Sequence, residues 1–536
     1  MNRPKNILFV LCDQLRWDYL SCYGHPYLHT PNIDWLAENG VRFDQAYVQS
    51  PTCGPSRASI MTGRYMSSHG TMNNTDPIPL SEKLMGEYLR PLGLKTAVVG
   101  KTDHRPDVHS MTRLGIDIDS ELGQRITFRD FDPYDRDLGL HTHATVNPEL
   151  KYNKYLNDHG YDGENPWQSW TQAVVDEDGN ILDGQIWSNI KYPSRLPDVH
   201  SESAYMTNRA IQFMTEMGDA PWCLQLGYYK PHWPYVASEP YHNMYPAQTH
   251  LPVNRGDDEL DGHPYLKTFQ NLRLSTVFNR KGAREMVVTA YMGLVKQVDD
   301  HFGRLLAFMR ENSLLENTMI VFTSDHGDNL GDHWAGEKDL PHDCSTRVPL
   351  LIYDPSSEAN ATRGVVEDRF VELIDILPTF IETGGGAVAE HQHKLEGRSL
   401  LPLLHRHQNV EWRDAVFCEF DYSHRDLGKL LEVGIDKGRG YMIRNGRFKY
   451  AIFEGFEQPM LFDMQEDPHE LIDLGTSSAH QAIRAELREQ LFRWLRNLKH
   501  RTTVTPDELT WRYGVEFEDK ARITIGWWED DEGRNF

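Results

Sequence analysis

A cysteine and an arginine early in the chain have types and spacing that could support chemistry on an oxyanion. Cys53 precedes Arg57 by four residues. Gly54 and Pro55 between them suit a turn, and Ala58–Thr62 reads as the start of a helix. We therefore expect Cys53 near the positive end of a helix, where backbone N–H groups and Arg57 favour an anion. Such a position could hold a nucleophile against a sulfate or phosphate group; the alternative is a buried cysteine before an ordinary helix.

Further polar groups follow apolar runs that read as buried strands, at 7–12, 95–100, 222–228 and 319–324. Ligands of α/β proteins bind at the carboxyl ends of such strands, so these polar groups are candidates for one shared site. Each has a simpler alternative: a strand-terminal Asp often caps a helix, a terminal Lys is often solvated, and a His between prolines is often a surface residue. The groups that follow the four runs, in chain order, are Asp13 with Gln14, Lys101 with Thr102 and His104, His232, and Asp325 with His326.

Helical patterns with one apolar face separate these runs, at 32–39, 203–217 and 284–311. The adjacent Asp299 and Asp300 lie within the last of them. Because neighbouring positions diverge around a helix, we expect this pair to be surface or structural residues and not metal ligands.

Length and composition limit the classes of protein. A chain of 536 residues favours one large and one smaller domain, and its net charge of −24 argues against nucleic acid or an anionic membrane as a partner. The six cysteines show no C-x-x-C spacing, so free thiols in a reducing cytoplasm are the simplest account. The run 7–12 is too short for a membrane span, and no signal peptide is visible. We therefore predict a cytoplasmic protein.

The cysteine segment carries a resemblance to a known family. Cys-x-Pro-Ser-Arg from Cys53, then Ala-Ser-x-x-Thr-Gly-Arg-Tyr ending at Tyr65, and Ser-Asp-His-Gly at 324–327 resemble the signatures of the type I sulfatases. That signature also covers the related phosphonate monoester hydrolases. A tyrosine-phosphatase loop does not fit, because its arginine lies two residues further along.

The resemblance implies a fold and a modification. The implied fold is α/β: an alkaline-phosphatase-like sandwich around a large mixed, mostly parallel sheet, with a smaller C-terminal antiparallel-sheet domain. The implied modification is oxidation of Cys53 to formylglycine by a maturation enzyme, giving an aldehyde whose hydrate is the nucleophile.

The resemblance also implies roles for individual residues. Gln14 stands where sulfatases usually have a second aspartate, and it could supply only an amide oxygen; the phosphonate hydrolase branch tends to carry this Asp-Gln pair. His104 arrives one residue later than in the family's Gly-Lys-x-His, so Thr102 could take a hydroxyl contact instead. The implied metal ligands are Asp13, Gln14, Cys53, Asp325 and His326. The implied catalytic residues are Cys53, Arg57, Lys101, His104, His232 and Lys338. The implied substrate-binding residues are Asn74, Lys101, Thr102, His232 and Lys338. One divalent ion fits these ligands, either Ca²⁺ or Mn²⁺ with Mg²⁺ also open.

The domain organisation predicted from these patterns has three parts. Residues 1–405 form the catalytic domain, in which 105–199 read as an irregular, substrate-shaping insertion. Residues 406–500 form a small α+β domain with strands at 415–420, 440–445, 447–453 and 460–463. The tail 501–536 carries the adjacent pair Trp527 and Trp528, which suggests docking on the body or on another subunit, so a homo-oligomer (dimer or tetramer) is expected.

These observations predict a sulfuric ester hydrolase. Its partners would be a small-molecule sulfate or phosphonate ester and the formylglycine-generating enzyme, without nucleic acid or membrane. The alternative is a phosphonate monoester or phosphodiester hydrolase with the same machinery, supported by Gln14, His326 and the absence of a visible signal peptide. A further alternative is a catalytically silent metal-binding scaffold, which would apply if Cys53 stays a thiol or the displaced His104 spoils the site.

Overall fold

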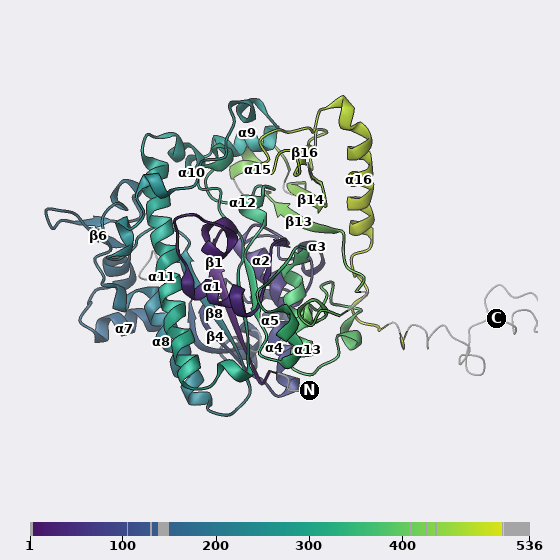
Figure 1. The fold of residues 1–536 in the computed structure, drawn as a ribbon. Coiled ribbons are helices and arrows are strands. Elements are labelled where there is room, and N and C mark those ends of the chain that lie inside the picture. Colours follow the sequence, from purple (N-terminus) through teal and green to yellow (C-terminus); the bar gives the residue numbers. More distant parts are fainter. Residues whose placement is uncertain are drawn as a thin grey trace, which may run out of the picture.

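The computed structural model describes residues 4–103, 105–128, 131–137, 150–407, 410–423, 426–434, 437–505 and 507–508. A large eight-stranded sheet forms the centre of the molecule (Figure 1). In sheet order its strands are β11 (Val365–Glu367), β2 (Val41–Phe43), β10 (Leu350–Tyr353), β9 (Thr318–Ser324), β1 (Asn6–Asp13), β8 (Trp222–Pro231), β4 (Lys95–Lys101) and β5 (Asp132–Asp137). The neighbours β9, β1, β8 and β4 run parallel, whereas β10 runs antiparallel to both β9 and β2. The predicted mixed, mostly parallel sheet is confirmed.

Strand β1 divides the hydrophobic core into two layers. Its residues Ile7, Phe9 and Leu11 belong to one buried cluster, and Leu8 and Val10 belong to another. This alternation follows from the two-residue period of a strand, and each such buried side chain contributes about 1.5–3 kcal/mol. The first cluster includes side chains of α2 (Cys53–Thr62), α4 (Met85–Leu89) and α13 (Ile376–Thr383); the second includes those of α1 (Pro31–Asn39), α8 (Glu202–Met217) and α11 (Ala283–Glu311). Helices therefore cover both faces of the sheet.

The long helix α11 also fixes the start of α1. Asp299 is fully buried, and its Oδ1 accepts hydrogen bonds from the backbone N–H groups of Asn32 at 3.0 Å and Ile33 at 2.9 Å. These are N–H groups of the first turn of α1, which have no partner within their own helix. The prediction that Asp299 is structural is confirmed.

The segment 105–199 is more regular than its sequence suggested. It contains α5 (Val108–Arg113), α6 (Glu121–Thr127), α7 (Lys151–Asp158) and a hairpin of β6 (Ala173–Val175) and β7 (Ile181–Asp183). It also supplies β5, which pairs in parallel with β4 and so extends the large sheet at its edge. A role in shaping the substrate site stays a prediction.

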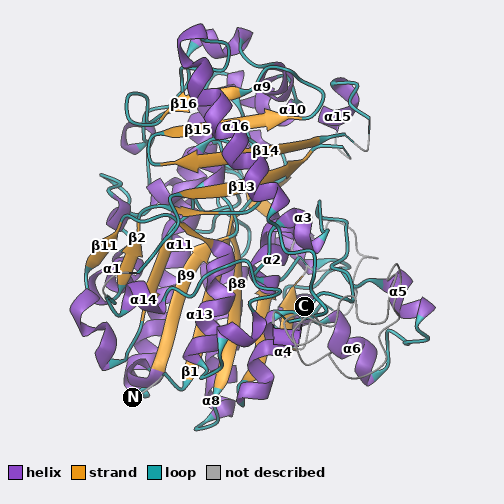
Figure 2. Cartoon of the chain, turned by 90° about the vertical axis from the view of Figure 1, so that its right-hand side faces the viewer, coloured by secondary structure: helices purple, strands orange, loops and turns teal. Residues whose placement is uncertain are grey.

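A second sheet carries the C-terminal part of the fold. Its strands β13 (Ala415–Asp421), β14 (Arg439–Asn445), β15 (Phe448–Phe453) and β16 (Met460–Asp463) pair antiparallel in chain order, as predicted. Helix α16 (Gln481–Arg496) packs on one face through Leu487 and Leu491. Figure 2 shows this sheet lying above the large one, and residues of both sheets share one buried cluster.

Shorter elements complete the described part of the chain. They are β3 (Ala46–Tyr47), α3 (Met66–His69), α9 (Pro264–Gln270), α10 (Arg273–Thr276), α12 (Asp343–Thr346), β12 (Val371–Glu372), α14 (Leu401–Leu404) and α15 (Asp426–Leu430). Across the residues that the structure describes, no helix has both the length and the apolar character needed to cross a membrane.

Candidate active site

The carboxyl ends of four neighbouring parallel strands meet at one edge of the large sheet. Strand β1 ends at Asp13 and β4 ends at Lys101. Strand β8 leads directly into His232, and β9 leads into Asp325 and His326. The structure therefore brings Asp13, Lys101, His232, Asp325 and His326 to one edge, as the order of the four apolar runs predicted.

Helix α2 delivers Cys53 to this edge. The helix begins at Cys53 itself and not at Ala58, which corrects the expected turn at Gly54 and Pro55. Proline is tolerated here because the N–H groups of a first helical turn have no intrahelical acceptor. The Gly54 N–H instead donates to Asn74 Oδ1 at 2.8 Å, so the side chain of Asn74 lies at the start of the helix.

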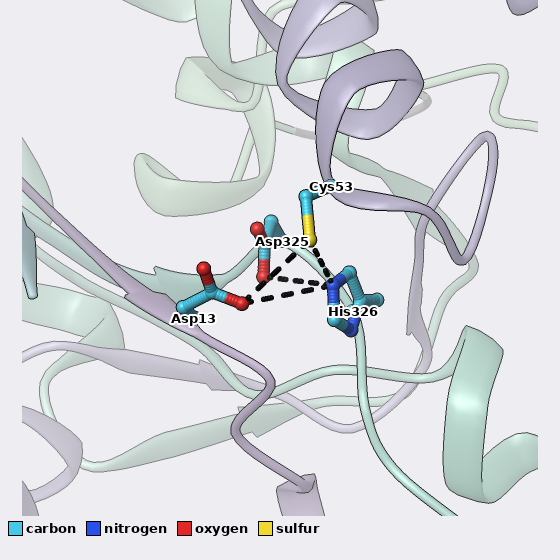
Figure 3. A group of neighbouring side chains, drawn as sticks. All are labelled: Asp13, Cys53, Asp325 and His326. Atoms are coloured by element: carbon cyan, nitrogen blue, oxygen red, sulfur yellow. Dashed lines mark hydrogen bonds and ion pairs between the residues drawn. The ribbon is translucent and has the colours of Figure 1, made fainter. Parts of the chain in front are cut away.

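The Cys53 thiol lies within a cluster of ionisable side chains (Figure 3). Its Sγ is 3.1 Å from His326 Nε2, 3.3 Å from Lys338 Nζ and 3.9 Å from Asp13 Oδ1. Burial, with a smaller contribution from Asp13, raises the pKa of the thiol to about 12. An unmodified Cys53 would therefore stay protonated near neutral pH, which is unsuited to a thiolate nucleophile.

The donor set around Cys53 fits a divalent cation. His326 Nδ1 donates to Gly327 O at 2.8 Å, which leaves the Nε2 lone pair facing Asp325 Oδ1 at 3.6 Å and Asp13 Oδ1 at 3.7 Å. Burial lowers the pKa of His326 to about 4, so the ring is neutral at neutral pH. A lone pair and two carboxylate oxygens repel one another unless a cation lies between them. Carboxylate oxygens suit Ca²⁺ or Mg²⁺, and the imidazole nitrogen leaves Mn²⁺ open.

The Gln14 side chain is oriented by Asp328. Gln14 Nε2 donates to Asp328 Oδ2, and Tyr235 donates its hydroxyl to the same oxygen at 2.8 Å. Because the Asp328 oxygen accepts from Gln14 Nε2, this contact turns Gln14 Oε1 the other way, to 3.2 Å from Lys338 Nζ. The amide oxygen therefore faces the site, as predicted. Asp328 lies close to Asp325 in the sequence, but no spacing there indicates this contact with Gln14.

Two cationic side chains, Arg57 and Lys101, contact the two aspartates. Arg57 Nε donates to Asp325 Oδ2 at 2.7 Å, and Arg57 Nη2 lies 3.5 Å from Asp13 Oδ2. Lys101 forms an ion pair with Asp13 and lies 3.2 Å from Asp103. Burial alone would raise the pKa of Asp13, but its cationic neighbours, above all Lys101, hold it well below the usual range. The carboxylate therefore remains charged and available as a ligand.

Of the remaining predicted residues, His232 lies beside this centre and Thr102 directly follows Lys101. His232 Nε2 is 3.5 Å from Lys338 Nζ, and His232 Nδ1 contacts Trp233 O at 2.5 Å. Thr102 Oγ1 accepts a hydrogen bond from Arg136 Nε at 2.8 Å, and its contact with substrate stays a prediction. His104 lies outside the described residues.

Two contacts at the site have no signal in the sequence spacing. The Lys101 ammonium lies 5.2 Å from the centroid of the Tyr229 ring, within the range of a cation–π contact. The Ser56 hydroxyl donates to Asp325 O at 2.5 Å, which ties α2 to the end of β9.

Comparisons with known proteins agree with this geometry. The sulfatase family model matches residues 5–386, and the model described as N-sulphoglucosamine sulphohydrolase, C-terminal, matches residues 331–497. The multifunctional alkaline phosphatase superfamily protein PehA of Trinickia caryophylli is 30% identical over 95% of this chain and 99% of its own. An arylsulfatase of Clostridium perfringens is 26% identical over 91% of this chain and 94% of its own.

Solved structures give the same result. The phosphonate monoester hydrolase SpPMH from Silicibacter pomeroyi superposes with a TM-score of 0.80 at 26% identity, covering 93% of this chain and 97% of its own. The phosphonate monoester hydrolase of Agrobacterium radiobacter gives a TM-score of 0.78 at 26% identity, covering 92% and 96%. The fold is alkaline-phosphatase-like, and the chain belongs to the sulfatase family.

Proposed function

We propose that this protein hydrolyses sulfate esters, using a nucleophile derived from Cys53 and one divalent metal ion. The observation that carries the proposal is the position of Cys53 at the start of α2, with Sγ 3.1 Å from His326 Nε2 and 3.3 Å from Lys338 Nζ. A cysteine, a histidine lone pair and a buried ammonium converge there beside two carboxylates. The arrangement supports attack on a small anionic centre.

The modified cysteine and the metal supply what the thiol lacks. Formylglycine at position 53 would supply a geminal hydroxyl as nucleophile, and a divalent cation held by Asp13, Gln14, Asp325 and His326 would lower the pKa of that hydroxyl. The unmodified side chains around position 53 would position these groups. Arg57 forms ion pairs with both Asp325 and Asp13 and so fixes the orientation of the two carboxylates.

Lys101 and Lys338 are the electrostatic part of the proposed site. Both are buried, yet nearby anionic groups raise the pKa of each amine, so both stay charged at neutral pH. Their ammonium groups would offset the charge that builds on the non-bridging oxygens in the transition state. His232, beside Lys338, would orient that ammonium through Nε2.

A second candidate substrate class is a phosphonate monoester or a phosphodiester. Like a sulfate ester, it presents a tetrahedral centre with one negative charge at neutral pH. Gln14 supports it, because the phosphonate hydrolase branch tends to carry the Asp-Gln pair that this chain has at Asp13 and Gln14. The likeness to two phosphonate monoester hydrolases supports it as well.

The first experiment is the mass of the peptide that contains Cys53, taken from protein made together with a formylglycine-generating enzyme. We expect aldehyde in place of thiol. An aryl sulfate and a phenyl phosphonate monoester are then compared as substrates by kcat/KM. Higher kcat/KM for the phosphonate monoester would favour the second class. An unmodified thiol without turnover of either ester would favour a catalytically silent scaffold.

The matched variants are Cys53→Ala and Cys223→Ala. Both remove a buried thiol, but Cys223 lies within β8 and away from the site. Cys53→Ala should abolish turnover and retain metal binding, and Cys223→Ala should retain both. Turnover by Cys53→Ala would refute the proposed nucleophile.

A further inference from the structure

A second cluster of metal-binding side chains uses none of the residues around Cys53. Glu259, His333 and His342 each offer one ligand atom, and these three atoms lie within 4.8 Å of one another. The residues are 6%, 3% and 0% exposed. Glu259 lies in the 3₁₀ helix Asp257–Asp261, His333 in the 3₁₀ turn Asp332–Trp334, and His342 directly before α12. Three separate segments therefore meet in a buried position.

His342 is the residue that points to a ligand. Neither of its ring nitrogens has a hydrogen-bond partner among the described residues. A buried polar group without a partner costs about 1–3 kcal/mol, so native structures rarely leave one. The ring stacks on His333 with centroids 3.7 Å apart and planes 12° apart, and Phe462 covers it at 5.4 Å. A nitrogen of His342, unpaired among the described residues, thus lies within 4.8 Å of the other two ligand atoms.

The other two residues already share a proton. His333 Nδ1 lies 2.6 Å from Glu259 Oε1, and Glu259 Oε2 accepts the backbone N–H of Gly256 at 2.7 Å. The carboxylate is therefore fixed in orientation by the backbone. Two imidazoles and one carboxylate form a ligand set that binds zinc, with Zn–N distances of about 2.0–2.1 Å. Oxygen-preferring cations such as Mg²⁺ are disfavoured by the two nitrogens.

We propose that Glu259, His333 and His342 bind a second divalent transition-metal ion, zinc by ligand class, with a structural role. Binding would turn the two rings out of their stacked arrangement, form one Zn–O and two Zn–N bonds, and release the proton shared by Glu259 and His333. No oxidation or reduction is involved. The ion adds a cross-link between the segment around residue 259 and the segment 333–342.

This position gives the cross-link a consequence for the active site. His333 and His342 bracket Lys338, whose ammonium contacts Cys53. The intervening backbone is strained: Trp334, Glu337 and Asp339 have φ values of 58°, 64° and 81°. Left-handed conformations of such residues cost about 1–3 kcal/mol each and persist only where surrounding contacts hold them. One ion bound by His333 and His342 would fix both ends of this segment.

The test separates the two metal sites. The double variant Asp13→Asn/His326→Ala removes proposed ligands of the first site, so a retained ion reports the second. The full chain is equilibrated with Zn²⁺, desalted and analysed for zinc per chain. We expect about one zinc in the double variant and none after adding His342→Phe. The matched control is His301→Gln, which removes a buried histidine from a different carboxylate, Asp198, at 3.1 Å and should leave the zinc unchanged.

A second measurement does not depend on the folding of His342→Phe. Co²⁺ added to the double variant should give the visible absorption bands of a tetrahedral site with nitrogen ligands, and Zn²⁺ should displace them. Zinc should also raise the Tm of the double variant, because a ligand that binds only the folded state stabilises it. A folded double variant that binds neither Zn²⁺ nor Co²⁺ would overturn the proposal. Zinc that persists after His342→Phe would overturn it too.

Discussion

The Asp328→Asn variant tests how the metal-binding edge is held in place. Every described partner of the Asp328 carboxylate is a donor: the Gln14 amide, the Tyr235 hydroxyl and the Leu330 N–H at 2.9 Å. An asparagine would place one N–H group against these donors. Gln14 would then turn its oxygen toward residue 328 and its amide N–H groups toward Lys338. The amide oxygen would be lost to the site.

The size of the effect follows from the contact that is lost. A hydrogen bond to a charged group contributes about 1.5–3 kcal/mol. Since about 1.4 kcal/mol corresponds to a factor of ten, kcat/KM should fall roughly 10- to 150-fold. Metal affinity should fall as well, since loss of a residue that orients a ligand typically costs about 10- to 100-fold.

The assay measures both quantities on modified protein: kcat/KM for the better of the two ester substrates, and the metal Kd by calorimetry after chelation. Tyr235→Phe is the control, because it removes a donor to Asp328 but leaves the carboxylate to orient Gln14. Its loss of kcat/KM and of metal affinity should be smaller than that of Asp328→Asn. Circular dichroism checks the fold of both variants. Wild-type kcat/KM and metal affinity in Asp328→Asn would refute the orienting role.

Three further variants test other parts of the structure. Lys338→Met removes an ammonium that lies 3.3 Å from Cys53 Sγ. Loss of one hydrogen-bond donor that stabilises transition-state charge typically lowers kcat by about 10²–10³, and we expect that loss here. An unchanged steady-state kcat would contradict the electrostatic role of Lys338. Gly54→Ala places a Cβ 2.9 Å from Asn74 Cα, so both Tm and kcat should fall; equal values would show that the loop yields freely. Burial raises the pKa of Glu419 from 4.5 to about 7. As pH rises, the unfolded state therefore loses this proton before the folded state does. The free energy of unfolding should fall by about 3 kcal/mol between these two pKa values. Glu419→Gln should lose less stability between pH 5 and 8 in urea titrations, and an identical loss would reject this origin.

The strands at the centre of the fold were predictable because their sequences are locally unambiguous. The run 7–12 is apolar throughout, as expected for a strand buried on both faces, and the structure places it between two other parallel strands. The residues that end such runs were predictable for the same reason. Parallel strands share one carboxyl edge, so the order of the runs was enough to gather Asp13, Lys101 and Asp325.

The start of α2 and the strand β5 were not predictable from local pattern. Pro55 reads as a helix breaker, yet the first turn of a helix makes no use of its missing N–H. Strand β5 has the sequence Asp-Pro-Tyr-Asp-Arg-Asp, without an apolar run. It is an edge strand with one neighbour, and edge strands carry charges and proline that a central strand excludes.

Contacts between distant side chains were out of reach for a different reason. Gln14 and Asp328 are 314 residues apart, and their hydrogen bond depends on two rotamers. Glu259 precedes His333 by 74 residues, with no spacing typical of a zinc motif. Such pairs become visible only when the backbone has been placed in three dimensions.

The buried Lys449 has a consequence for how the molecule unfolds. Its ammonium, on β15, lies 2.6 Å from Asp343 Oδ1 and 2.6 Å from Glu470 Oε1, and Asp343 follows the segment that carries Lys338. Separating the small sheet from the large one would break the ion pair with Asp343 and expose the buried apolar cluster that the two sheets share. The two sheets are therefore expected to melt in a single calorimetric transition. A chain shortened to residues 1–405 would lose the geometry around Lys338 along with its small sheet.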